Sequence, residues 1–150
     1  MTQEEKNLLI KDLCCRLPYG VKISIPELWI NEKKIEVLNE IFKGDDGLYR
    51  VNDSGMLIKH IKPYLFPLSS MTEEQSIELF KLFGISLVDS IGADYIKINE
   101  CTGITFFLNK GFDVETHLDK LIDWLNKNHF DYRGLIPMGS AIDATNLNIY

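Results

Sequence analysis

The apolar pattern of residues 113–126 constrains the fold more than any other part of the sequence, because it predicts an amphipathic helix. Apolar side chains recur there at intervals of three and four residues, at Leu118, Leu121, Ile122 and Leu125. We expect Leu121 and Leu125 to be nearly fully buried. The segment that follows, HFDYRGLIPM, is apolar but interrupted by Gly134 and Pro137. Since so apolar a segment is unsuited to be a free tail, we expect it to lie across the protein and close its core.

Length and composition indicate an ordinary globular protein. The 150 residues are 45% hydrophobic and 25% charged, and no apolar run approaches the roughly 18 residues that suggest a membrane span. The polar start MTQEEKN does not resemble a signal peptide, and three cysteines do not suggest a disulfide framework. We therefore expect a cytoplasmic protein with unpaired cysteines. Residues 1–150 should form a single compact unit, with 18–64 and 72–139 as candidate sub-lobes.

A first helix is predicted over residues 2–17. Thr2 and Glu5 have the spacing of a capping box, in which each side chain accepts a hydrogen bond from the other residue's backbone N–H. The predicted apolar stripe consists of Ile10, Leu13, Cys14 and Leu17. Cys14 is thus expected to be a small buried residue. The proline and glycine in residues 18–20 should end the helix.

Residues 21–62 are predicted to form three or four short antiparallel strands, folded as a small curled sheet or a barrel. Apolar and polar residues alternate over 21–25, as in a half-buried strand. Glycine and polar residues at 43–47 and 52–55 have the composition of turns. The apolar spacing of residues 35–42 fits either a strand or a helix, and the turn that follows favours the strand.

The block IKPYLFPLSSM, residues 61–71, connects the predicted sheet to the second half of the chain. Pro63 and Pro67 exclude a regular helix, because proline lacks a backbone N–H and clashes with the preceding turn. Its apolar residues are Tyr64, Leu65, Phe66 and Leu68. We expect them to make the block an ordered, buried bridge. A helix should follow over residues 72–83. Two pairs have capping-box spacing at its start: Ser70 with Glu73, and Thr72 with Gln75.

Two strands are predicted at 95–99 and 104–108, joined by a turn at 100–103. Ile96 and Ile98 would face the apolar residues Ile104, Phe106 and Leu108. The polar residues 140–150 are expected to fray. The predicted fold class is therefore α+β: an N-terminal helix, a small antiparallel sheet or barrel, and a C-terminal α+β lobe packed on a shared core.

Three blocks of sequence carry a resemblance to a known family. They are LCCRLPYGV at 13–21, IKPYLFPLSSMTEE at 61–74 and IDWLNKNHFDYRGLIPMG at 122–139. In this order they resemble an uncharacterised protein family of gut Bacteroidales genomes and their prophages. Two positions differ, since the family commonly has Arg at the place of Phe66 and Leu at the place of Ser140. The resemblance implies a phage or mobile-element setting and brings no established activity.

Residues 128–133 hold the densest set of reactive side chains. His129 is a candidate general base that Asp131 would orient, with Arg133 holding an anion. The favoured alternative is structural, with His129 capping a helix and the other two residues holding the following turn. Four residues are of the types that bind metals: His60, Cys101, His117 and His129. Their spacing matches no zinc pattern, so we predict neither a metal nor a cofactor.

Lysines and aromatic residues in the first half of the chain form a candidate binding set. It comprises Trp29, Lys33, Lys34, Tyr49, Lys59, Tyr64 and Phe66. Such side chains on a small sheet can bind a peptide or single-stranded nucleic acid. The simpler interpretation is a solvated sheet face. A net charge of −6 disfavours nucleic acid, because phosphates are repelled at long range.

Three functions are consistent with these patterns. The leading hypothesis is a non-enzymatic accessory or protein-interaction protein of phage or mobile-element origin, whose partner is another protein and not a membrane. The first alternative is a nucleic-acid-associated factor that uses the small sheet. The second is an enzyme with a site around His129, Asp131 and Arg133.

Overall fold

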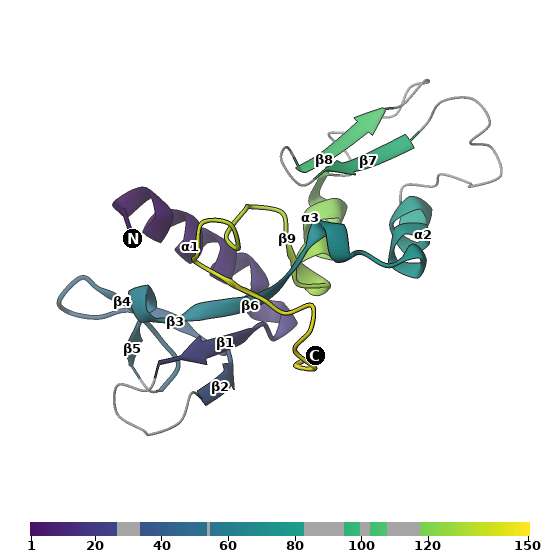
Figure 1. Ribbon diagram of the computed structural model, residues 1–150. Helices are drawn as coiled ribbons and strands as arrows, with labels where there is room; N and C mark the ends of the chain where they lie inside the picture. The colour runs from purple at the N-terminus through teal and green to yellow at the C-terminus, as the bar shows by residue number, and fades with distance from the viewer. Residues whose placement is uncertain (27–33, 54, 83–94, 100–102, 108–117) are drawn as a thin grey trace. The chain divides into compact units, whose positions relative to one another are not determined.

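The computed structural model describes residues 1–26, 34–53, 55–82, 95–99, 103–107 and 118–150 (Figure 1). Helices and mixed sheets occur together, which confirms the predicted α+β class. The chain divides into two compact units. Unit 1 comprises Met1–Leu65 and Arg133–Tyr150, and unit 2 comprises Phe66–Tyr132. The candidate sub-lobes differ from these units, since the first helix and the last residues belong with the small sheet.

The first helix, α1 (Gln3–Arg16), begins at the predicted capping box. The hydroxyl of Thr2 accepts a hydrogen bond from the N–H of Glu5 at 3.1 Å, and the carboxylate of Glu5 accepts one from the N–H of Thr2 at 2.7 Å. A single 3-10 turn, Leu17–Tyr19, follows the helix. Gly20 then adopts a left-handed conformation with φ of 65°, which ends the helix as predicted.

The buried face of α1 is offset by one residue from the predicted stripe. Its buried residues are Leu9, Asp12, Leu13 and Arg16. Cys14 is exposed, so the prediction that it is buried was wrong. The offset arises because Asp12 and Arg16 form an ion pair in the interior. Two charged residues thus occupy positions that a hydrophobic pattern assigns to solvent.

The main sheet of unit 1 has the strand order β10-β6-β1-β2 (Figure 1). β1 (Lys22–Ile25) is antiparallel both to β2 (Lys34–Val37) and to β6 (Lys62–Pro67). β10 (Ile142–Asp143) is parallel to β6. The proline-containing block is therefore a strand inside a sheet. Tyr64, only 2% exposed, confirms that the block is buried in this unit.

A second, smaller sheet of unit 1 contains β3 (Ile41–Lys43), β4 (Tyr49–Val51) and β5 (Met56–Leu57). Each strand is antiparallel to the next, and a 3-10 turn, Ile58–His60, follows β5. The residues predicted to form one small sheet thus belong to two sheets. The strands of the described residues form no closed barrel.

Asn52 explains why residues 35–42 form two strands instead of one. Its side-chain oxygen accepts a hydrogen bond from the N–H of Asn39 at 2.9 Å, and its amide nitrogen donates to the carbonyl of Val37 at 2.9 Å. These bonds replace a strand partner where β2 ends. Asn52 has φ of 50°, a conformation that asparagine adopts more readily than most residues.

The core of unit 1 is built from α1, both sheets and the final segment. Its buried apolar residues are Leu9, Leu13, Val21, Ile23, Ile25, Leu38, Val51, Ile58, Ile61, Leu65, Leu135 and Ala141. The predicted alternation in β1 is confirmed by Val21, Ile23 and Ile25. Leu135 confirms that the segment HFDYRGLIPM closes a core, although Met138 in the same segment is exposed.

The last residues of the chain are held against β6, so the prediction that they fray was wrong. The N–H of Ala144 donates to the carbonyl of Leu65 at 2.8 Å, next to the β10 pairing. Ser140 and Ala141 are buried. The prediction considered the polar side chains, whereas backbone hydrogen bonds hold this segment in place.

Unit 2 contains α2 (Glu73–Leu82) and α3 (Leu118–Lys127). A 3-10 turn, Leu68–Ser70, precedes α2. The predicted capping box is present, because the N–H of Thr72 donates to the side chain of Gln75 at 2.9 Å and the N–H of Gln75 donates to the hydroxyl of Thr72 at 3.3 Å. The predicted first turn of α3, residues 113–117, lies outside the described residues.

The predicted hairpin of unit 2 is confirmed. β7 (Tyr95–Asn99) and β8 (Gly103–Phe107) are antiparallel. Their register places Ile96 opposite Phe106 and Ile98 opposite Ile104, as the alternation of apolar residues predicts.

The core of unit 2 lies around α3 and β9 (Phe130–Asp131), and β9 is parallel to residues 66–67 at the end of β6. Its buried residues are Leu68, Leu79, Leu121, Trp124, Leu125 and Phe130. Leu121 and Leu125 are 4% and 2% exposed, which confirms the predicted helix register. The rings of Trp124 and Phe130 are stacked, with centroids 5.7 Å apart.

Candidate functional site

The three candidate catalytic residues are divided between the two units. His129 belongs to unit 2 and follows α3 with φ of 57°, and its N–H donates to the carbonyl of Asn126 at 3.1 Å. This geometry is that of a helix C-cap and supports its structural role. Asp131 is buried in β9 of the same unit. Arg133 belongs to unit 1, where its Nε lies 3.2 Å from a carboxylate oxygen of Asp12.

The seven candidate binding residues differ in their surroundings. Two of them, Trp29 and Lys33, lie outside the described residues. Lys34 forms an ion pair with Glu36 at 2.6 Å. Tyr64 is buried, so it does not present a surface to a partner. Phe66 is half-buried and packs against the core of unit 2.

The two remaining candidates, Tyr49 and Lys59, line a hollow in unit 1. The lining residues are Lys6, Leu48, Tyr49, Leu57, Ile58 and Lys59. The hollow is shallow: its empty space of about 210 Å³ includes open solvent, and the part that a water-sized group can occupy is about 30 Å³. Its lining thus combines apolar side chains with two cations, one from α1 and one from the 3-10 turn after β5.

Among the described residues, no ion pair neutralises the positive charge at this hollow. Neither Lys6 nor Lys59 forms an ion pair with a residue that the structure describes. The ammonium group of Lys43 lies 5.9 Å from the ring centroid of Tyr49, within the range of a cation–π contact. The hollow is therefore suited to a group that brings both apolar surface and negative charge.

A tight turn between β3 and β4 positions one wall of the hollow. The carboxylate of Asp46 accepts a hydrogen bond from the N–H of Leu48 at 3.0 Å and pairs with Arg50 at 2.5 Å. Hydrogen bonds from the Arg50 guanidinium hold the pKa of the Asp46 carboxyl well below its usual range. The turn thus fixes the backbone at Leu48, whose side chain is exposed.

Sequence reasoning missed four residues of the hollow: Lys6, Leu48, Leu57 and Ile58. For Lys6 a signal exists, because it precedes the buried Leu9 by three residues and helical spacing places it at the margin of the buried face. For the other three, no sequence pattern indicates proximity to α1, since only tertiary packing creates it.

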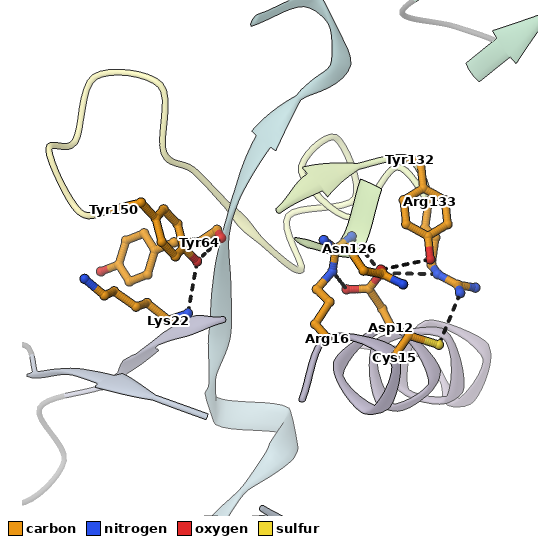
Figure 2. Close-up of polar contacts among 9 residues, drawn as sticks. All are labelled: Asp12, Cys15, Arg16, Lys22, Tyr64, Asn126, Tyr132, Arg133 and Tyr150. Atoms are coloured by element: carbon orange, nitrogen blue, oxygen red, sulfur yellow. Dashed lines mark hydrogen bonds and ion pairs between the residues drawn. The ribbon is translucent and has the colours of Figure 1, made fainter. Parts of the chain in front are cut away.

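Unit 1 also contains a buried cluster of charged residues around Asp12 (Figure 2). Arg16 donates to the two carboxylate oxygens of Asp12 at 2.7 and 3.1 Å, and both side chains are 0% exposed. Arg133 lies against the same carboxylate and also donates to the sulfur of Cys15 at 3.7 Å. One carboxylate thus binds two guanidinium groups, which ties α1 to the start of the final segment.

A second polar contact ties the final segment to the main sheet (Figure 2). The N–H of Lys22 donates to the hydroxyl oxygen of Tyr150 at 3.0 Å, and this hydroxyl donates to the carbonyl of Tyr64 at 2.9 Å. The residue Tyr150 as a whole is 43% exposed, but these two backbone groups enclose its hydroxyl. Burial is the main cause that raises the pKa of Tyr150 to about 12.

Tyr150 should therefore ionise later than an ordinary tyrosine. Its pKa in the folded protein is about 12, against about 10 in an unfolded chain, so the unfolded chain loses this proton first. Stability should fall as the pH rises through the interval between these values. Titration of phenolate absorbance should show a late step that is missing in the Tyr150→Phe variant. Identical titration curves for the two proteins would contradict the assignment.

No protein-family model, curated protein or solved structure matches this chain. In the described parts of the chain, every helix is too short or too polar to cross a lipid bilayer. The His, Cys, Asp and Glu side chains of the same residues form no group of three that could hold a metal ion.

Proposed function

We propose that this chain is a non-enzymatic protein-interaction protein, and that its hollow docks a partner segment in which an apolar side chain lies next to acidic residues. The observation that carries this proposal is the lining of the hollow. Leu48 and Leu57 provide apolar contact, while Lys6 and Lys59 provide cations without an ion-pair partner among the described residues. Lys6 and Lys59 attract the acidic side chains of such a segment at short range, and apolar contact holds it there.

A protein partner fits this lining better than nucleic acid does. Half of the lining residues are aliphatic, whereas grooves for single-stranded nucleic acid present stacking aromatics along a basic path. The lining contains one aromatic residue, Tyr49, whose ring already contacts the ammonium group of Lys43. The net charge of −6 also opposes binding of a polyanion.

The structural contacts of two candidate catalytic residues also support a non-enzymatic function. The guanidinium of Arg133 contacts Asp12 and Cys15 within unit 1, and the backbone of His129 caps α3 in unit 2. We further propose a cytoplasmic protein of phage or mobile-element origin. The origin is supported by the resemblance of the three sequence blocks, and the compartment by Cys14 and Cys15, which are both free thiols.

The proposal can be tested with two acetylated, amidated tripeptides, one of aspartate, leucine and glutamate and one of lysine, leucine and lysine. Amide chemical shifts of the full chain should move on titration with the acidic peptide, above all at Leu48, Tyr49 and residues 57–59. The basic peptide should leave them unchanged. The variant Lys59→Glu should weaken the response to the acidic peptide at least about tenfold, because the change replaces attraction by repulsion.

Lys11→Glu is the matched control for this experiment. Lys11 is exposed on the same helix as Lys6, does not line the hollow and undergoes the same change of charge. Its variant should respond to the acidic peptide like the unmodified chain. An equal response to both peptides, or an equal loss in both variants, would contradict the proposed site. Tighter binding of an oligothymidine to the same residues would instead support the nucleic-acid alternative.

A further inference from the structure

The outer strand of the main sheet, β2, has an unusual arrangement of side chains. Ile35 and Val37 point to one face and are 46% and 40% exposed, although they are the apolar residues of the strand. Lys34 and Glu36 lie on the other face and form an ion pair at 2.6 Å. Among the described strands, β2 is the last in the order β10-β6-β1-β2, so it is an edge strand. Exposed apolar residues on an edge strand favour pairing with another strand.

The register with β1 shows which backbone groups face outward. The N–H of Leu38 donates to the carbonyl of Val21, so these two residues form a hydrogen-bonded pair. Because hydrogen-bonded and non-hydrogen-bonded pairs alternate in an antiparallel ladder, Glu36 and Lys34 also bond toward β1. The backbone groups of Ile35 and Val37 therefore point away from β1. The bond from the Asn52 side chain to the Val37 carbonyl agrees with this assignment.

We infer that β2 pairs with β2 of a second copy of this chain, antiparallel and centred on Ile35. In this register the two copies of Ile35 exchange both of their backbone hydrogen bonds. Lys34 of each copy lies opposite Glu36 of the other, so the charges are self-complementary. The two main sheets then become one continuous sheet across the two-fold axis.

Other registers of the same strand are less suitable. Centring on Glu36 would place two glutamates directly opposite each other, which is destabilising. Centring on Glu36 or on Val37 would also put the carbonyl of Val37, which already accepts a bond from Asn52, among the central hydrogen bonds. Among these registers, only the one centred on Ile35 pairs opposite charges and forms its central hydrogen bonds from the backbone groups of Ile35 alone.

This self-association is independent of the proposed docking function. The residues 34–37 of β2 are distinct from those that line the hollow. Peptide binding is measured by amide chemical shifts, whereas self-association is measured by sedimentation equilibrium. Either inference can therefore fail without the other.

Charge reversal in matched pairs tests the register by sedimentation equilibrium. The unmodified chain should form a reversible dimer with a dissociation constant below about 1 mM. Lys34→Glu places like charges opposite each other at both positions of the dimer, and so does Glu36→Lys, so each variant alone should associate at least about tenfold more weakly. An equimolar mixture of the two variants should dimerise again, because every opposing pair then has opposite signs.

Ile35→Pro provides a second test that does not depend on charge. Its N–H faces away from β1, so proline at this position removes a bond of the dimer while the β1 ladder is kept. This variant should be monomeric with an unchanged circular dichroism spectrum. An unmodified chain that remains monomeric at about 1 mM would overturn the inference. A mixture of the charge variants that associates no better than each variant alone would overturn the register.

Discussion

Replacing Asp12 by alanine should lower the free energy of unfolding of unit 1 by about 3–5 kcal/mol. The reason is that one fully buried carboxylate faces the guanidinium groups of both Arg16 and Arg133. Without it, the buried charge of Arg16 loses the group that offsets its desolvation, and the two cations repel each other. Residue-resolved amide hydrogen exchange measures this change in unit 1 separately from unit 2.

Two variants serve as controls for this result. Glu4→Ala removes an exposed carboxylate from the same helix and should change stability by less than about 0.5 kcal/mol. The double variant Asp12→Leu with Arg16→Met should recover most of the loss, because it removes both members of the buried pair and leaves Arg133 partly exposed. A loss below about 1 kcal/mol in Asp12→Ala would show that the cluster does not depend on this carboxylate.

Replacing Leu125 by alanine should lower the free energy of unfolding of unit 2 by about 2–5 kcal/mol. Leu125 is 2% exposed and belongs to the cluster that contains Leu121, Trp124 and Phe130. The substitution removes its contacts and leaves a cavity that close-packed neighbours fill only in part. Hydrogen exchange of the amides of α3 should report the loss.

Leu147→Ala is the matched control for this substitution. Leu147 is 40% exposed, so the same change of side chain should alter stability by less than about 0.5 kcal/mol. Equal effects of the two substitutions would show that burial in the described core does not determine the stability of α3.

The parts of the fold that follow local rules could be predicted from the sequence. Both capping boxes, the β7–β8 register and the burial of Leu121 and Leu125 depend on spacing within one segment. The offset of the buried face of α1 could not be predicted in this way. It depends on Arg133, which follows Asp12 by more than a hundred residues. The guanidinium group of Arg133 contacts the Asp12 carboxylate and so helps to stabilise the buried ion pair of Asp12 and Arg16.

Less of the candidate site could be predicted. The chemical types of Tyr49 and Lys59 predict binding residues, but the hollow they line also contains Lys6 from α1. The same reasoning predicts Tyr64, which is buried because β6 is a strand inside the main sheet. Side-chain type indicates what a residue can bind, whereas the strand order decides whether it reaches the surface.

Because unit 1 consists of two separate segments of the chain, the order of synthesis determines when it can fold. Tyr150 binds the carbonyl of Tyr64, a residue 86 positions earlier, and all of unit 2 lies between the two segments. A ribosome releases β6 first, then the whole of unit 2, and only then β10. Unit 2 is one continuous segment and can therefore fold during synthesis. Unit 1 cannot close until residues 133–150 emerge, so it is completed only after all of unit 2 has been synthesised.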